Sequence, residues 1–174
     1  MSGAKCELEL IATLLHEESA LSLATVDENG EAWVAPLYYI PDADLALCWL
    51  SSRSSLHSVN LARNSKASAT VYRHAETWRE IRGLQMRGQV SVVTQRERRR
   101  TLIERYRERF QLGALFRAAI SQCTLYVFRP EFFRYLDNSR RFGYRFELIR
   151  EDSDWECFPP AAVKQRDANS ALPS

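Results

Sequence analysis

Hydroxyl, imidazole and guanidinium side chains are concentrated in one short stretch of the chain, Ser51 to Ala67. It opens with serines and carries Arg53 and His57 near its start. Serine hydroxyls, basic side chains and the free N–H groups at the start of a helix together favour binding of an anion such as a phosphate. An ordinary capped helix would use the same serines, with Ser54 or Ser55 as its N-cap. Residues outside this stretch are needed to distinguish an anion site from an ordinary capped helix.

Two apolar runs flank this stretch and predict the elements that position it. Leu45 to Leu50 comes before it and Ala67 to Tyr72 after it, and both are short and rich in β-forming residues. Leu56, Val59 and Leu61 stand near helical spacing between them. A buried strand, a serine loop and a helix start are therefore expected to meet at the serines.

The remaining chain predicts an antiparallel sheet with inserted helices. Asn29-Gly30 is a hairpin signal, Pro36 indicates a sheet edge or a bulge, and Gly83 and Gly88 indicate bulges or close approaches. The expected helices cover 1–18, 95–110 and 112–120, and the expected strands cover 20–26, 31–40, 45–50, 67–72, 81–94, 124–128, 132–137 and a last run over 144–149. About six to seven strands in a closed or nearly closed barrel, with flanking helices, predict the α+β class.

Length and charge predict one soluble domain. The 174 residues carry a net charge of +2, which gives no general attraction to nucleic acid or membrane. Residues 1–150 are expected to form the domain, and residues 151–174 a polar, flexible tail. The four cysteines are scattered, and no apolar run reaches the length of a membrane span. These features predict reduced thiols and a cytoplasmic location.

Several kinds of catalytic site are excluded by missing motifs. The six glycines never fall as GxG, and the sequence has no GxSxG and no HExxH. His16, His57 and His74 are the only histidines, and none stands at metal-ligand spacing from a cysteine. Metal chemistry and acyl transfer are therefore not expected.

Seven arginines lie between Arg96 and Arg109, mixed with three glutamates. They could contact the phosphates of RNA or DNA. They could equally form a solvated helix face with Glu–Arg pairs at helical spacing. Because the charge is mixed and the chain is nearly neutral, we favour the solvated face and do not expect a nucleic-acid partner.

Four segments of the chain resemble the pyridoxamine 5'-phosphate oxidase-like, FMN-binding split-barrel superfamily, in particular its small bacterial members. They are ATVDENGEAWVAPLYYI, LSSRSSLHSVNLARNSKASATVY, EIRGLQMRGQV and LDNSRRFGYRFEL, and they span about Ala20 to Leu148. Their order and spacing together carry the resemblance. It implies a split barrel, FMN as the cofactor, and a homodimer with the cofactor between the subunits.

In the second segment, Ser51, Ser55 and His57 stand where the family has a hydroxyl, a serine and a lysine. The resemblance therefore implies that they face the phosphate end of FMN. Leu56 replaces the family's arginine, and Arg53 could substitute for it.

The other segments assign further contacts by the same resemblance. The backbone of Ala35 to Leu37 would pass the flavin ring, without the arginine and lysine that the oxidases carry on this strand. Arg82 and Gln85 resemble polar cofactor contacts, although they could simply face solvent. Asn138 and Arg145 do not map onto the oxidases, whose C-terminal Arg-Leu-His motif is absent. The residues assigned to the cofactor are Ala35, Pro36, Leu37, Leu50, Ser51, Ser55, His57, Asn60, Arg82 and Gln85.

The sequence thus predicts a dimeric FMN-binding protein, and a flavin-dependent oxidoreductase acting on a small molecule that the sequence does not name. The missing substrate motif argues against a genuine pyridoxamine 5'-phosphate oxidase. A flavin-binding module without catalysis, and an RNA- or DNA-binding protein using the arginine helix, are the alternatives. Some relatives use haem or deazaflavin instead, but no histidine follows His74 to serve as a haem ligand in the C-terminal region.

Overall fold

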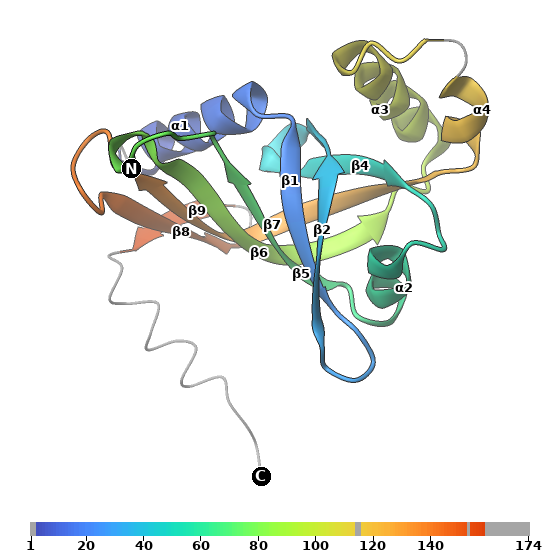
Figure 1. Ribbon diagram of the computed structural model, residues 1–174, viewed down its shortest axis with the longest axis horizontal. Helices are drawn as coiled ribbons and strands as arrows, with labels where there is room; N and C mark the ends of the chain where they lie inside the picture. Colours follow the sequence, from blue (N-terminus) through green and yellow to red (C-terminus); the bar gives the residue numbers. More distant parts are fainter. Residues whose placement is uncertain (1–2, 114–115, 153, 159–174) are drawn as a thin grey trace.

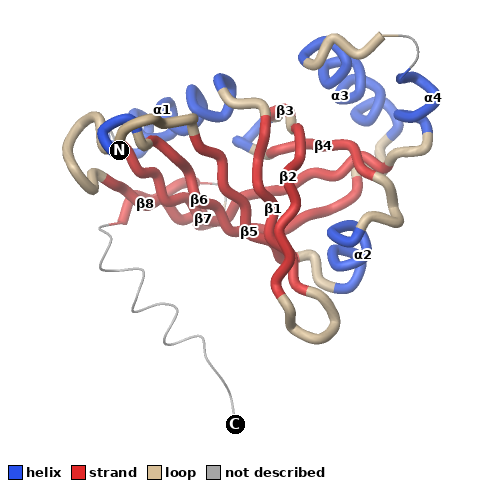
Figure 2. The backbone as a smooth tube through the Cα atoms, in the orientation of Figure 1, coloured by secondary structure: helices blue, strands red, loops and turns tan. Residues whose placement is uncertain are grey.

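In the described part of the chain, nine antiparallel strands form one strongly curved sheet, with helices at its ends, as Figures 1 and 2 show. The computed structural model describes residues 3–113, 116–152 and 154–158. The strands are β1 Ala20–Val26, β2 Ala32–Tyr38, β3 Ile40–Pro41, β4 Leu47–Ser51, β5 Lys66–Tyr72, β6 Arg82–Val92, β7 Thr124–Asp137, β8 Arg145–Glu151 and β9 Asp154–Phe158. The helices are α1 Gly3–Glu17, α2 Leu56–Arg63, α3 Arg96–Arg109 and α4 Phe116–Ser121, with single 3-10 turns at Ala43–Leu45 and Trp78–Glu80. The α+β split-barrel prediction is confirmed.

The sheet has the strand order β2-β1-β5-β6-β7-β4-β3, and β8 and β9 branch from β7. β7 joins the two halves, because its first residues pair with β4, its later residues with β8, and the run from Tyr126 to Asp137 with β6. β2 ends the order, so Pro36 lies on an edge strand, as predicted.

One expectation about β7 is wrong. The sequence predicted two strands separated by Arg129-Pro130, because proline cannot donate to a ladder. The structure has one continuous strand. The register with β6 shifts between Arg87 and Gly88, so that Gly88 pairs with Pro130 while Glu131 is extra. The irregularity accommodates the proline without ending the strand.

The same irregularity explains Gly88. A Cβ atom placed on Gly88 would lie 2.1 Å from the carbonyl oxygen of Arg129. The two strands approach so closely here that only a residue without a side chain fits. The close approach expected at Gly88 is therefore an approach of the β7 backbone.

The barrel interior holds the main core, and a second, smaller core lies under α3. The main core includes Trp49 and Phe133, and Ile11 and Leu15 of α1 extend it at one end of the barrel. Trp49 is fully buried and stacks on Tyr126 with ring centroids 5.7 Å apart. The residues of the second core are Ile40, Ala46, Cys48, Val93, Leu102, Tyr106, Leu125 and Val127.

β9 was not expected from the sequence. It lies within the segment predicted as a polar tail, and it pairs with β8 from Asp154 to Phe158. Residues 159–174 of that segment lie outside the described part of the chain. Among the described residues, no helix has the length and apolar character needed to cross a bilayer.

Candidate functional site

Three side chains of the serine stretch converge where β4 ends and α2 begins. Ser51 is the last residue of β4, Ser55 is the N-cap of α2, and His57 lies in its first turn. The Nε2 atom of His57 is 2.7 Å from Ser51 Oγ and 3.1 Å from Ser55 Oγ, and the two hydroxyls are 3.0 Å apart. We call this group the Ser51–Ser55–His57 cluster.

The start of α2 leaves donors available beside the cluster. Ser55 occupies the N-cap position but makes no capping hydrogen bond with its side chain. Its hydroxyl donates instead to the carbonyl oxygen of Ser52 at 2.8 Å. The N–H groups of the first turn of a helix have no intrahelical acceptor, so an anion at this point can accept from them.

The surroundings of His57 favour the neutral form of its imidazole. Partial burial lowers its pKa below the usual value, because burial disfavours the charged form. A neutral imidazole can donate one hydrogen bond and accept another, which suits its place between two hydroxyls. A bound phosphate would favour the protonated form, so His57 can take up a proton as the anion arrives.

The free edge of β2 lies close to this cluster. Among the described residues, β2 pairs with β1 along one edge only, and both α2 and β4 contact it. Figure 1 shows α2 below β4 and beside the β1–β2 hairpin. An unpaired strand edge presents backbone N–H and C=O groups. It can therefore hydrogen-bond the edge of a planar heterocycle.

The predicted ring contacts lie on this edge strand, on alternate faces. Ala35 pairs with Leu23 and Leu37 with Leu21, so both lie on the core side of β2. Pro36 lies on the outer side. Their backbone atoms, rather than their side chains, would meet a flavin ring.

Three residues assigned to this region from the sequence contact other parts of the protein. Leu50 packs against the second core. Asn60 is buried and donates from Nδ2 to Thr25 Oγ1 at 3.1 Å, which ties α2 to β1. Arg53 donates from Nε to Thr124 Oγ1 at 3.0 Å, so in this arrangement its guanidinium contacts β7 and does not replace the family's arginine.

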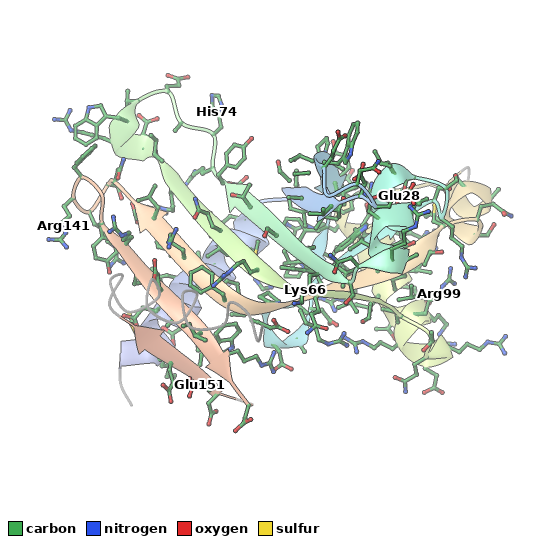
Figure 3. The ribbon with its side chains drawn as sticks, turned by 90° about the horizontal axis from the view of Figure 1, so that it is seen from below. Glu28, Lys66, His74, Arg99, Arg141 and Glu151 are labelled. Atoms are coloured by element: carbon green, nitrogen blue, oxygen red, sulfur yellow. The ribbon has the colours of Figure 1, made fainter. Side chains whose placement is uncertain are left out.

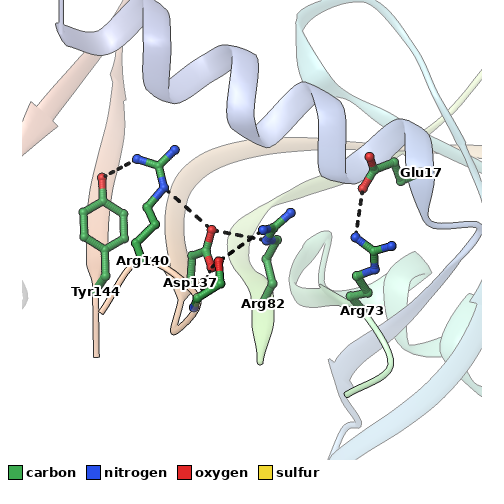
Figure 4. A network of polar contacts seen from close by, with 7 residues as sticks. Glu17, Arg73, Arg82, Asp137, Arg140 and Tyr144 are labelled. Atoms are coloured by element: carbon green, nitrogen blue, oxygen red, sulfur yellow. Dashed lines mark hydrogen bonds and ion pairs between the residues drawn. The ribbon is translucent and has the colours of Figure 1, made fainter. Parts of the chain in front are cut away.

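Arg82 and Gln85 lie on β6 and line a separate cavity of about 670 Å³. Arg82 is paired with the buried carboxylate of Asp137 at 3.2 Å, and Arg140 approaches the same carboxylate at 3.7 Å (Figure 4). Asn138, which could not be mapped from the sequence, holds the β7–β8 turn. Its Nδ2 donates to the carbonyl oxygen of Trp78, and its Oδ1 accepts from the N–H of Gly143.

The role of Asp137 was not expected from the sequence. An acidic residue next to asparagine at the end of a strand indicates a turn. Its pairing with Arg82 depends on the β6–β7 register, which no local pattern shows.

The arginines of α3 are largely used inside the protein. Arg98 and Arg105 bind the two carboxylate oxygens of Asp42 at 2.7 and 2.9 Å. Arg99 donates to the carbonyl oxygen of Cys123, and Arg109 donates to carbonyl oxygens at the C-terminal end of α1 and just after it. These contacts stabilise the docking of α3, so fewer of the arginines are available for a nucleic-acid backbone.

The described residues contain no group of three His, Cys, Asp or Glu side chains placed to hold a metal ion. Their cysteines are all free thiols, and burial raises the pKa of Cys48 to about 12.

Comparison with known proteins gives the same fold. The chain is 27% identical to the UPF0306 protein of Klebsiella pneumoniae over 127 residues, which cover 72% of this chain and 82% of that protein. Among solved structures, the heme storage protein HutZ of Vibrio cholerae is 24% identical, with a TM-score of 0.60 over 71% of this chain and 89% of that one. A pyridoxamine 5'-phosphate oxidase-related, FMN binding protein of Nostoc punctiforme is 17% identical, with a TM-score of 0.60 over 91% of this chain and 96% of that one.

A protein-family model also matches most of the chain. The model described as Pyridoxamine 5'-phosphate oxidase matches residues 8–137, from α1 through β7. That range includes the Ser51–Ser55–His57 cluster and the edge strand β2. The chain therefore belongs to the pyridoxamine 5'-phosphate oxidase family.

Proposed function

We propose that this protein binds FMN, with the phosphate at the Ser51–Ser55–His57 cluster and the ring along the free edge of β2. The observation that carries the proposal is the convergence of two hydroxyls and an imidazole at a helix start without a side-chain cap. A flavin needs an anion site at its tail and backbone hydrogen bonds at its ring edge, and this region offers both.

The proposed activity is a flavin-dependent oxidation or reduction of a small molecule. Bound FMN would supply the redox chemistry, and the protein would bind and orient the cofactor. The absence of the oxidases' Arg-Leu-His motif supports a substrate other than pyridoxamine 5'-phosphate. A solved structure with the same fold is described as a heme storage protein, so the visible spectrum of the purified protein is the first test that separates flavin from haem.

We expect the protein to bind FMN more tightly than riboflavin, because only FMN carries the terminal phosphate that the cluster would hold. One charge-assisted hydrogen bond contributes roughly 1.5–3 kcal/mol, so the preference should be at least about tenfold. Calorimetric titration with FMN, FAD and riboflavin measures it. Equal affinities for FMN and riboflavin would contradict phosphate binding at the Ser51–Ser55–His57 cluster.

We further propose a homodimer through the outer face of β2 and β1. Val34 is 67% exposed and Tyr38 is 63% exposed on this face. Val34, Ser22 and Ala24 line a hollow of about 420 Å³. Small residues beside exposed apolar ones form a surface that a second copy can cover.

Light scattering at micromolar concentration should give twice the chain mass of 20.1 kDa. Val34→Glu should shift the protein toward the monomer, because the dimer would bury the new charge. Arg100→Gln, which changes an exposed side chain on α3, is the control. A monomer mass for the wild-type protein with flavin still bound would contradict the interface.

A further inference from the structure

A cavity lies between α2 and the sheet, where β6 ends and β7 begins. Its volume of about 480 Å³ is within the range of small-molecule sites. Figure 3 shows α2 near the labelled Glu28, at the same end of the molecule as Arg99 of α3. We call this cavity the α2 slot. None of the residues assigned to the cofactor lines it; the residues that line it are Arg53, Ser58, Leu61, Ala62, Val90, Ser91, Val92, Thr124 and Tyr126.

The helix wall of the α2 slot is largely apolar. Ser58, Leu61 and Ala62 have the spacing i, i+3 and i+4, which places them on one face of α2. Ser58 is buried, and its Oγ lies 2.8 Å from Ser55 Oγ. The Ser58 hydroxyl therefore already has a hydrogen-bond partner, and a ligand on this side would meet mainly Leu61 and Ala62.

The strand wall consists of side chains on the core-facing side of the sheet. Val92 pairs with Tyr126, and Val90 pairs with Phe128, which is fully buried in the main core. Paired and alternate residues share a face, so Val90, Val92 and Tyr126 all face the barrel interior. Val92 is nevertheless 44% exposed. The core therefore does not fill the barrel at this point, and apolar surface stays in contact with water.

One cation lies at the exposed side of the α2 slot. Arg53 donates from Nε to Thr124 Oγ1 at 3.0 Å, which fixes its guanidinium beside β7. The Nη groups of Arg53 make no hydrogen bond or ion pair with the described residues, and the Thr124 hydroxyl has no acceptor among them. The described residues that line the slot include no acidic side chain. An anionic group here can therefore accept from Arg53 and Thr124 without displacing a carboxylate of the protein.

The two walls and the cation together determine the class of ligand. Apolar surfaces on both sides favour a hydrocarbon body, because its burial removes apolar area from water. Arg53 is the one cation among the described residues that line the slot, so a single negative charge is matched. A carboxylate suits this cation best, because it can accept two parallel hydrogen bonds from a guanidinium.

We propose that the α2 slot is a second ligand site, which binds a small monocarboxylate with an apolar chain. The chain lies between Leu61 and Val92, and the carboxylate pairs with Arg53. The slot shares no residue with the Ser51–Ser55–His57 cluster, although Ser58 is a hydrogen-bonded neighbour of Ser55. The proposal therefore does not depend on flavin binding.

The test uses octanoate and its neutral analogue octanamide, each titrated calorimetrically into the full-length protein. One octanoate should bind per chain, at least about tenfold more tightly than octanamide, because only the carboxylate forms charge-assisted hydrogen bonds. Arg53→Gln should remove this difference by weakening octanoate, with octanamide binding nearly unchanged. The comparison of the two ligands on wild-type protein needs no variant, so it stays valid if a variant fails to fold.

Two variants of α2 separate the effect of the cavity from that of the charge. Ala62→Leu should weaken both ligands at least about fivefold, because it fills the slot with a side chain that helices accommodate well. Arg63→Gln should change neither, because Arg63 does not line the slot and pairs with Glu28 at 3.0 Å. Circular dichroism melting curves verify that each variant is folded.

Five outcomes would overturn the proposal. They are no saturable binding of octanoate by the wild-type protein, equal affinities for octanoate and octanamide, unchanged octanoate binding in Arg53→Gln, unchanged binding in Ala62→Leu, and one-for-one displacement of octanoate by FMN. The last outcome would place the carboxylate at the Ser51–Ser55–His57 cluster instead of the α2 slot.

Discussion

Replacing Ser55 and His57 together by alanine is expected to weaken FMN binding at least tenfold. Each side chain would lose a hydrogen bond to a charged phosphate, which costs roughly 1.5–3 kcal/mol. Riboflavin lacks the phosphate, so its affinity should change much less. The difference between the two ligands, measured by calorimetry on wild-type and variant protein, isolates the effect on the phosphate site from any general damage to α2.

The control for this variant is a pair of exposed arginines on α3, Arg96→Gln with Arg100→Gln. Neither side chain makes a hydrogen bond or ion pair with the described residues, so flavin affinity should stay the same. Arg98 and Arg99 would be poor controls, because they anchor α3. A silent double alanine variant together with an impaired arginine variant would place the anion site on α3. Loss of salt-sensitive RNA retention in the arginine variant, with flavin binding intact, would favour a nucleic-acid partner.

Gly88→Ala is expected to destabilise the fold by about 3 kcal/mol, although it adds a single methyl group. The new Cβ would lie 2.1 Å from the carbonyl oxygen of Arg129 and 2.9 Å from Pro130 Cα. Both atoms belong to the backbone of β7, so the two strands would have to separate, and overpacking of this kind typically costs about 1–3 kcal/mol or more. Urea unfolding followed by circular dichroism measures the loss.

Gly113→Ala provides the matched control. A Cβ atom at Gly113 has no heavy atom within 4 Å, and the substitution should stay within about 0.5 kcal/mol of wild type. If Gly88→Ala were as stable as Gly113→Ala, the result would contradict the close approach of β6 and β7 at Gly88.

Local signals in the sequence were sufficient to predict the strand and helix that position the candidate site. Ala20–Val26 and α2 were expected within a few residues of where they lie, because alternation, a hairpin dipeptide and a cap residue are properties of neighbouring residues. The serine loop at the helix start was expected for the same reason, and the family resemblance singled out Ser51, Ser55 and His57 within it. They fall within seven consecutive positions, across one strand end and one helix start.

Features that depend on distant parts of the chain could not be predicted in this way. β9 is only five residues long, and it is a strand because β8 offers it an edge. The arginines of α3 resembled a solvated face, but Asp42 binds two of them from more than fifty positions earlier. Arg53 could have joined the anion site on sequence grounds, and its contact with Thr124 on β7 directs it elsewhere. Each of these outcomes is set by tertiary pairing, which overrides local preference.

The position of β7 in the chain has a consequence for biosynthesis. β4 pairs with β3 on one side and with β7 on the other, and Leu47 and Trp49 of β4 are fully buried in the finished core. On the ribosome, β4 emerges well before Thr124 to Phe128, its partner segment in β7. At roughly 5–20 residues per second, translating the intervening residues takes several seconds. During that interval the nascent chain carries an apolar strand with one unpaired edge, which is the kind of segment that chaperones bind and that aggregates when it meets a second copy.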